Sequence, residues 1–172
     1  MLEFAHQEHV KSYYLDSRNQ TFELPPLSQQ EEADVCVIGA GFFGLSAALE
    51  LAEKGKKVIV LEGARVGFGA SGRSGGQAIN GFEEGIDEYI AQVGFDKAKK
   101  LWDMSLEAID IIDERIAKYG IQCDWKKGYA TLALNERRME DLIAIEKASH
   151  EIFGYQNMQL WDKTKLEQHL GS

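Results

Sequence analysis

The stretch Asp34-Val-Cys-Val-Ile-Gly-Ala-Gly-Phe-Phe-Gly-Leu-Ser-Ala-Ala-Leu-Glu-Leu-Ala-Glu-Lys-Gly-Lys-Lys-Val-Ile-Val-Leu-Glu62 decides the fold of this chain. Two short apolar runs, 35–38 and 58–61, have the composition of parallel strands buried on both faces. Between them lies a segment of helical length that begins at a G-x-G-x-x-G turn. Such a turn is a weak signal alone, but flanking strands and a terminal acid are the context that supports it. The stretch therefore predicts one strand–turn–helix–strand unit.

The glycines of this turn have separate predicted roles. Gly39 permits the tight turn out of the first strand, Gly41 lets the backbone approach a pyrophosphate, and Gly44 lets the helix pack closely on the strand. The N-terminus of the helix directs its N–H groups and positive dipole end at the phosphates. Glu62 stands where a carboxylate can accept hydrogen bonds from an adenosine ribose. A glycine turn without a ligand is the alternative, and the number of positions in register favours a dinucleotide site.

A second glycine-rich segment follows directly, over 63–81. It has neither helical nor strand periodicity, so we expect a long loop, and long loops in compact domains are usually functional. Its glycines allow backbone N–H groups to form an anion nest and allow a flat ring to lie against the chain. A flexible linker is the alternative, and four specific side chains weigh against it: Arg65, Phe68, Arg73 and Gln77.

Together the two glycine segments resemble the FAD-binding start of the D-amino-acid-oxidase-like family of flavoenzymes. The run from Gly67 to Gln77 is similar to the second glycine loop of its amine-oxidising branch, as are Ser12-Tyr13-Tyr14, Cys123-Asp124-Trp125 and Gly128-Tyr129. The resemblance implies FAD as cofactor and assigns twelve residues to it. Those for the pyrophosphate are Gly39, Gly41, Phe42, Phe43 and Gly44; Glu62 is for the ribose, and Arg65 for the ribose or adenine; those for the phosphate and isoalloxazine side are Ala70, Ser71, Gly75, Gly76 and Gln77. Phe43 departs from the branch, where a small or hydroxyl residue is usual.

The activity that the resemblance implies is FAD-dependent oxidation of a primary or secondary amine, such as a gamma-glutamylated polyamine. Hydride would pass to the flavin, the imine would hydrolyse to an aldehyde, and O2 would reoxidise the flavin. The small-molecule amine and O2 are thus the expected partners, and no residue is marked as a catalytic base. Two alternatives stay open. The first is a catalytically incompetent fragment that binds nucleotide or associates with itself, because family members are several hundred residues long and this chain looks like a truncated N-terminal part. The second is an NAD(P)-dependent dehydrogenase.

Composition excludes several classes of function. The 172 residues are 44% hydrophobic, which is typical of a folded domain rather than a disordered chain. A net charge of −9 argues against nucleic acid or an anionic membrane as a partner. The N-terminus lacks the features of a signal peptide, and no apolar run approaches the roughly 20 residues that span a bilayer. Two cysteines suggest no disulfide framework, so we expect a cytoplasmic protein; no metal-binding spacing is present.

We expect an α/β fold in which the Rossmann-like FAD-binding unit is followed by a mostly helical segment with a short strand pair. The predicted regions are an N-terminal arm over 1–33, the FAD-binding unit with the second glycine loop over 34–84, and the helical segment with the start of a substrate domain over 85–172. Helices are expected over 86–93, over 95–119, from a cap at Asn135 to about residue 153, and after a cap at Asp162. Alternation over 128–134 predicts a strand. The acidic residues of 95–119 alternate with basic ones, which favours a solvated face over a metal site.

Overall fold

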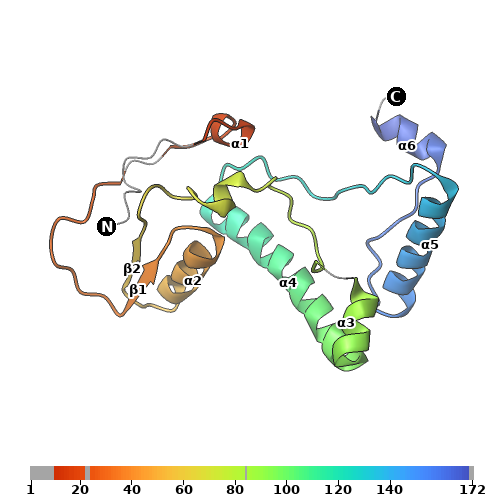
Figure 1. Ribbon diagram of the computed structural model, residues 1–172, viewed down its shortest axis with the longest axis horizontal. Coiled ribbons are helices and arrows are strands. Elements are labelled where there is room, and N and C mark those ends of the chain that lie inside the picture. Colours follow the sequence, from red (N-terminus) through yellow and green to blue (C-terminus); the bar gives the residue numbers. More distant parts are fainter. Residues whose placement is uncertain (1–9, 22–23, 84, 171–172) are drawn as a thin grey trace. The chain divides into compact units, whose positions relative to one another are not determined.

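The computed structural model describes residues 10–21, 24–83 and 85–170, and Figure 1 shows its elements. They are α1 (Tyr13–Asp16), β1 (Val35–Ile38), α2 (Phe42–Glu53), β2 (Val58–Leu61), the 3-10 helix η1 (Ala70–Arg73), α3 (Ile86–Val93), α4 (Phe95–Tyr119), α5 (Glu136–Glu151) and α6 (Lys163–Leu170). By compactness the chain forms two units. The first comprises residues up to 78 together with 115–125, and the second comprises 79–114 and 126–172. The three functional regions expected from the sequence stay predictions.

The first unit contains the predicted strand–turn–helix–strand arrangement. β1 and β2 are parallel, with Val35 opposite Val58 and Ile38 opposite Leu61. α2 connects the two strands and contacts both of them. Asp34 connects the starts of the two strands, because its carboxylate accepts a hydrogen bond from the backbone N–H of Lys57 at 2.8 Å. The α/β class expected from the sequence is confirmed.

The β1–β2 pair is covered on one face. Ala40 and Ala48, where the turn and α2 meet the strands, are 2% and 8% exposed. Side chains along β1 alternate between half-buried and exposed, and Ile38 is 87% exposed. Cys36 lies on the same exposed face as Ile38, so β1 is not buried on both faces as its composition predicts. Within the described part of the chain, this face of the sheet has no covering layer.

The second unit is helical, and its helices begin where the sequence predicts. The Asn135 side chain accepts a hydrogen bond from the N–H of Arg138 at 3.0 Å and caps α5. Asp162 accepts from the N–H of Lys165 at 2.8 Å and caps α6 in the same way. α3 and α4 have the bounds expected from the sequence, and Gly94 and Gly120, which follow their last residues, have φ values of +82° and +59° that favour glycine. In the described residues, no helix has both the length and the apolar character needed to cross a membrane.

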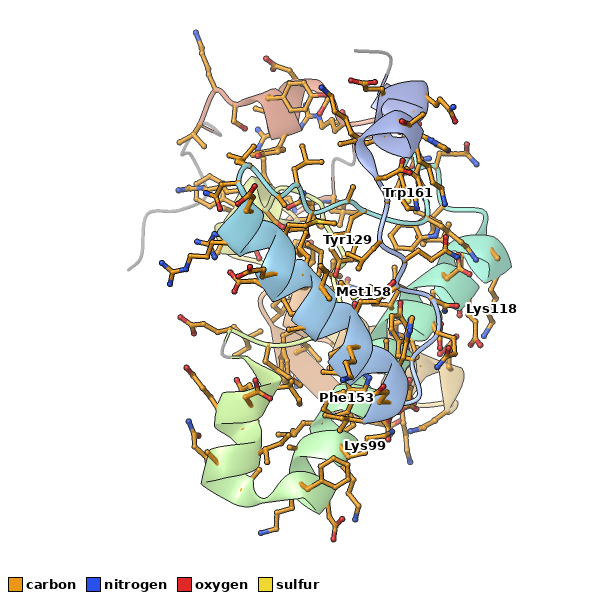
Figure 2. The ribbon with its side chains drawn as sticks, turned by 90° about the vertical axis from the view of Figure 1, so that its right-hand side faces the viewer. Lys99, Lys118, Tyr129, Phe153, Met158 and Trp161 are labelled. Carbon is orange, nitrogen blue, oxygen red and sulfur yellow. The ribbon has the colours of Figure 1, made fainter. Side chains whose placement is uncertain are left out.

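Aromatic side chains form the core of the second unit. The ring centroids of Trp102 and Phe153 are 5.1 Å apart, and those of Phe95 and Phe153 are 6.3 Å apart. Ala98 beside them on α4 is fully buried. Figure 2 shows Phe153 at the end of α5 and Met158 in the segment that follows it. This segment returns along α5, because the His150 ring nitrogen lies 3.0 Å from the carbonyl oxygen of Met158.

One expectation for the helical segment is wrong. No strand forms over 128–134, because none of the described residues pairs with this stretch; the strand pair of the fold is β1–β2. Leu134 in this stretch is 88% exposed, so the alternating pattern of 128–134 does not mark a buried face. The helix expected over 95–119 does form, and its apolar side chains are only partly covered: Ala98 is buried, whereas Ile112 and Tyr119 are exposed.

Candidate functional site

The site begins at the turn between β1 and α2, where backbone packs directly against backbone. A Cβ atom built on Gly44 would lie 2.0 Å from the carbonyl oxygen of Gly39. No side chain fits at that distance, so α2 approaches the end of β1 as closely as it does only because residue 44 is glycine. Gly39 itself has a φ of +100°, a conformation that favours glycine. The predicted roles of these two glycines in the turn are confirmed by the geometry.

The second glycine segment is hydrogen-bonded to this turn. The N–H of Gly67 donates to the carbonyl oxygen of Ala40 at 2.9 Å. The N–H of Phe42, the first residue of α2, donates to the hydroxyl of Ser71 at 2.9 Å. A Cβ atom on Gly41 would lie 2.8 Å from the same hydroxyl oxygen. The segment is therefore an anchored loop, and the flexible-linker alternative does not describe it.

Within this loop, η1 is an element that sequence periodicity did not predict. It spans only Ala70–Arg73, which is too short to show a repeat. Its tight geometry depends on glycine, because a Cβ atom on Gly72 would stand 2.1 Å from the carbonyl oxygen of Gly67. In the sequence, the spacing of Gly67 and Gly72 on either side of Ser71 is the signal that could have indicated η1. η1 places the Ser71 hydroxyl at the N-terminus of α2.

Glu62 links both glycine segments. One carboxylate oxygen accepts the N–H of Ala40 at 2.8 Å, and the other accepts the N–H of Ala64 at 3.0 Å. An ionised carboxylate has about four acceptor positions, so both oxygens keep capacity for ribose hydroxyls. The predicted ribose contact stays a prediction. The structure adds that this carboxylate also fixes the turn beside it.

The structure brings together half of the predicted cofactor residues around the α2 N-terminus. These are Gly39, Gly41, Phe42, Gly44, Glu62 and Ser71. The others are exposed around this centre: Phe43 at 87% on the first turn of α2, and Arg65, Ala70, Gly75, Gly76 and Gln77 along the loop. No described contact ties the five loop residues of this second group to the α2 N-terminus.

The opposite end of α2 is held by charged contacts to the end of α4. The Lys118 ammonium group lies 2.6 Å from the Glu53 carboxylate, and the Arg115 guanidinium lies 2.8 Å from Glu50. The hydrogen bond from Lys118, followed by that from Tyr119, lowers the pKa of Glu53 to about 2. These contacts fix the helix whose other end forms the site.

The arrangement can bind an oxyanion. The N-terminus of α2 carries N–H groups and the positive end of the helix dipole, and the glycines leave room for a diphosphate to approach the backbone. The Ser71 hydroxyl accepts from Phe42 and keeps its own proton to donate to a phosphate oxygen. The described residues include no cluster of three or more His, Cys, Asp or Glu side chains that could hold a metal ion. The geometry fits the diphosphate and ribose of a dinucleotide.

Comparison with known proteins gives a consistent result. The profile of the DAO family, described as "FAD dependent oxidoreductase", matches residues 34–171. The chain is 86% identical over all of its 172 residues to "Probable oxidoreductase OrdL" of Haemophilus influenzae, of which it covers 40%. It is 40% identical over 96% of its length to "Gamma-glutamylputrescine oxidoreductase" of Escherichia coli, covering 38% of that protein. A "Probable oxidoreductase OrdL" of Rhizobium meliloti is 30% identical over 87% of the chain, which covers 35% of it. The chain thus spans at most about 40% of the length of these relatives, and no solved structure matches it.

Proposed function

Since the chain belongs to the DAO family of FAD-dependent oxidoreductases, we propose that it holds the ADP half of FAD in a flavoenzyme that oxidises an amine. The observation that carries this proposal is the closure of the second glycine segment on the α2 N-terminus, with Glu62 bonded to both segments. This geometry combines donors for a diphosphate with acceptors for a ribose. A site for a single free anion would need only the donors.

Each residue of the site has a role in binding. The backbone at Gly41 and the N-terminus of α2 would receive the diphosphate, and the Ser71 hydroxyl would donate to one of its oxygens. Glu62 would accept from the ribose hydroxyls while it holds Ala40 and Ala64 in place. The stretch Gly75–Gln77 would lie along the flavin side. When bound, FAD supplies the redox chemistry by accepting hydride from the amine carbon; the protein binds and orients.

The amine is proposed to resemble gamma-glutamylputrescine, with O2 as the electron acceptor. The support is the name of the Escherichia coli relative, which matches nearly the whole chain at 40% identity. The Haemophilus influenzae relative is more similar, but its name specifies no substrate. The proposed substrate therefore depends on one relative, and it needs a test that is separate from the test of FAD binding.

A chimera tests the substrate. The matching segment of the Haemophilus influenzae protein is replaced by this chain, which is 86% identical to it. We expect a yellow protein that forms hydrogen peroxide and an aldehyde from gamma-glutamylputrescine, and does so faster than from putrescine. A yellow chimera that oxidises other amines but not this one would contradict the substrate. A folded but colourless chimera would contradict the cofactor.

A second candidate concerns the chain on its own, as a nucleotide-binding or self-associating protein without oxidase activity. The observation that favours it is the exposure of large apolar side chains near the site, with Ile38 and Phe43 each 87% exposed. Apolar area of this kind favours association. We expect sedimentation of the 172-residue chain to show dimers or larger species, and the double variant Ile38→Ser, Phe43→Ser to shift it toward monomer. A monomeric chain that makes peroxide from gamma-glutamylputrescine would rule this candidate out.

The nicotinamide-dependent dehydrogenase is the least favoured alternative. Family membership argues for FAD, and the site geometry does not separate the two dinucleotides because both carry an ADP half. A fluorescence titration with NADH decides between them. Tighter binding of NADH than of FAD would favour the dehydrogenase alternative.

A further inference from the structure

An open cavity of about 240 Å³ is lined by residues of the N-terminal arm and of the second glycine loop. The arm contributes Arg18 and Gln20 to its wall, and the loop contributes Arg65, Val66 and Gly67. Drug-sized ligands occupy cavities of about 300–1,000 Å³, so this one suits a smaller molecule or a single group of a larger one.

The charge of the cavity is opposite to that of the chain. Two arginines line it, and its lining includes no acidic residue, although the chain as a whole carries a net charge of −9. Among the residues that the structure describes, neither Arg18 nor Arg65 forms an ion pair or a side-chain hydrogen bond. A guanidinium group offers a planar set of donors that matches a carboxylate or a phosphate. Two such groups beside one cavity are suited to an oxyanion.

The arm wall of the cavity is held by specific contacts. The Ser12 hydroxyl accepts from the N–H of Leu15 at 3.3 Å and caps α1. The Asn19 amide donates to the carbonyl oxygen of Gln122 at 3.1 Å and to the carboxylate of Asp124 at 3.0 Å. These contacts flank Arg18 on both sides in the sequence. The backbone on either side of Arg18 is therefore held by the fold of the arm.

We propose that this cavity is a binding site for a small organic or inorganic oxyanion, held between Arg18 of the arm and Arg65 of the loop. Arg65 is also one of the residues that the family resemblance assigns to the cofactor, whereas Arg18 is not, so the test is made on the chain without FAD. Two sources share this chemistry. One is the carboxylate of a small substrate, and the other is a phosphate group, free or part of a nucleotide.

The test is a calorimetric titration of the 172-residue chain, without FAD, with glutarate and separately with inorganic phosphate. We expect at least one of the two anions to bind. Arg18→Gln should weaken that binding by about tenfold, because a charged donor pair is lost. Arg18→Lys should also weaken it, because the charge stays but the planar fork is lost. Lys11→Gln is the matched control, since it removes a charge from the arm outside the cavity lining and should leave the affinity unchanged.

A second variant keeps the test independent of any folding defect at Arg18. Gln20→Glu places an acid on the cavity wall and should abolish anion binding, with the far-ultraviolet circular dichroism spectrum unchanged. Binding of glutarate alone would identify a substrate carboxylate as the source, and binding of phosphate alone would identify a phosphate group. The proposal is overturned if neither anion binds, or if Lys11→Gln weakens binding as much as Arg18→Gln does.

Discussion

The hydroxyl of Ser71 lies 2.9 Å from the backbone nitrogen of Phe42 and accepts its hydrogen bond. These residues belong to separate glycine-rich segments, so this contact closes one segment over the other. It also places a rotatable O–H group at the N-terminus of α2, where a helix most favours an anion. The contact therefore serves both the fold of the loop and the proposed binding of the diphosphate.

Ser71→Ala should weaken the binding of ADP and lower the free energy of unfolding by about 1 kcal/mol. The N–H of Phe42 loses its partner, and the donor proposed for a phosphate oxygen is removed. Ser46→Ala on the exposed surface of α2 is the control and should change neither quantity. Calorimetric titration measures the ADP affinity, and urea denaturation measures the free energy of unfolding. Unchanged ADP affinity in Ser71→Ala would show that the hydroxyl is structural only.

Gly44→Ala should destabilise the first unit by about 1–3 kcal/mol, the range typical of overpacking. Its Cβ atom would stand 2.0 Å from the carbonyl oxygen of Gly39, so the helix or the strand must move. Gly69→Ala is a matched control, because a Cβ atom there meets nothing within 4 Å. Urea denaturation should show a lower midpoint for the first variant and almost no change for the second. Equal midpoints would contradict the close approach of α2 to β1.

Glu62→Gln should weaken FAD binding while the fold persists. The amide oxygen is a weaker acceptor than a carboxylate oxygen, and a hydrogen bond to a charged group is worth about 1.5–3 kcal/mol. One of the two backbone donors, Ala40 or Ala64, would also face an NH2 group that cannot accept. Glu32→Gln in the exposed arm serves as the control. A dissociation constant equal to that of the unchanged chain would show that Glu62 does not contact the ribose.

The contacts between Glu53 and α4 predict a specific dependence of stability on pH. Lys118 and Tyr119 lower the pKa of Glu53 to about 2 from its usual value of 4.5. A group whose pKa is depressed by folding stabilises the folded state above the unfolded pKa and loses that effect as pH falls through the folded pKa. The stabilisation is therefore present above pH 4.5 and is lost between about 4.5 and 2.

Glu53→Gln should flatten the fall in the unfolding midpoint over this pH range. Glu107→Gln, an exposed position on α4, should not. Because Glu53 is open to solvent, added salt should reduce the difference between the unchanged chain and Glu53→Gln. An unaltered pH profile in Glu53→Gln would mean that the contact with Lys118 does not form in solution.

The parts of the fold that sequence predicts well are those specified by neighbours in the chain. The bounds of α3 and α4 are those expected from the apolar pattern of the chain. Asn135 and Asp162 indicate in the sequence where the helices that they cap begin. The strand–turn–helix–strand unit is predictable for the same reason, since each element is marked by residues inside it.

The parts that sequence misses depend on contacts between distant residues. The loop that contains η1 is held by two hydrogen bonds, from the N–H of Gly67 to the carbonyl oxygen of Ala40 and from the N–H of Phe42 to the hydroxyl of Ser71. No local sequence pattern reveals these bonds. The alternation over 128–134 has no partner strand among the described residues, so it marks no sheet. For the site, the glycines and Glu62 are readable from the motif, whereas the bonds from Glu62 to Ala40 and Ala64 require the structure.

We propose that the two glycine segments together hold the ADP half of FAD. Calorimetric titration of the 172-residue chain and of Gly41→Asp, each with FAD and with ADP, measures this binding. A side chain at position 41 would meet the Ser71 hydroxyl at 2.8 Å and add negative charge where the diphosphate is expected. We expect the unchanged chain to bind FAD and ADP with similar affinities, and a folded Gly41→Asp to bind neither. Equal FAD binding by the unchanged chain and by Gly41→Asp would contradict it.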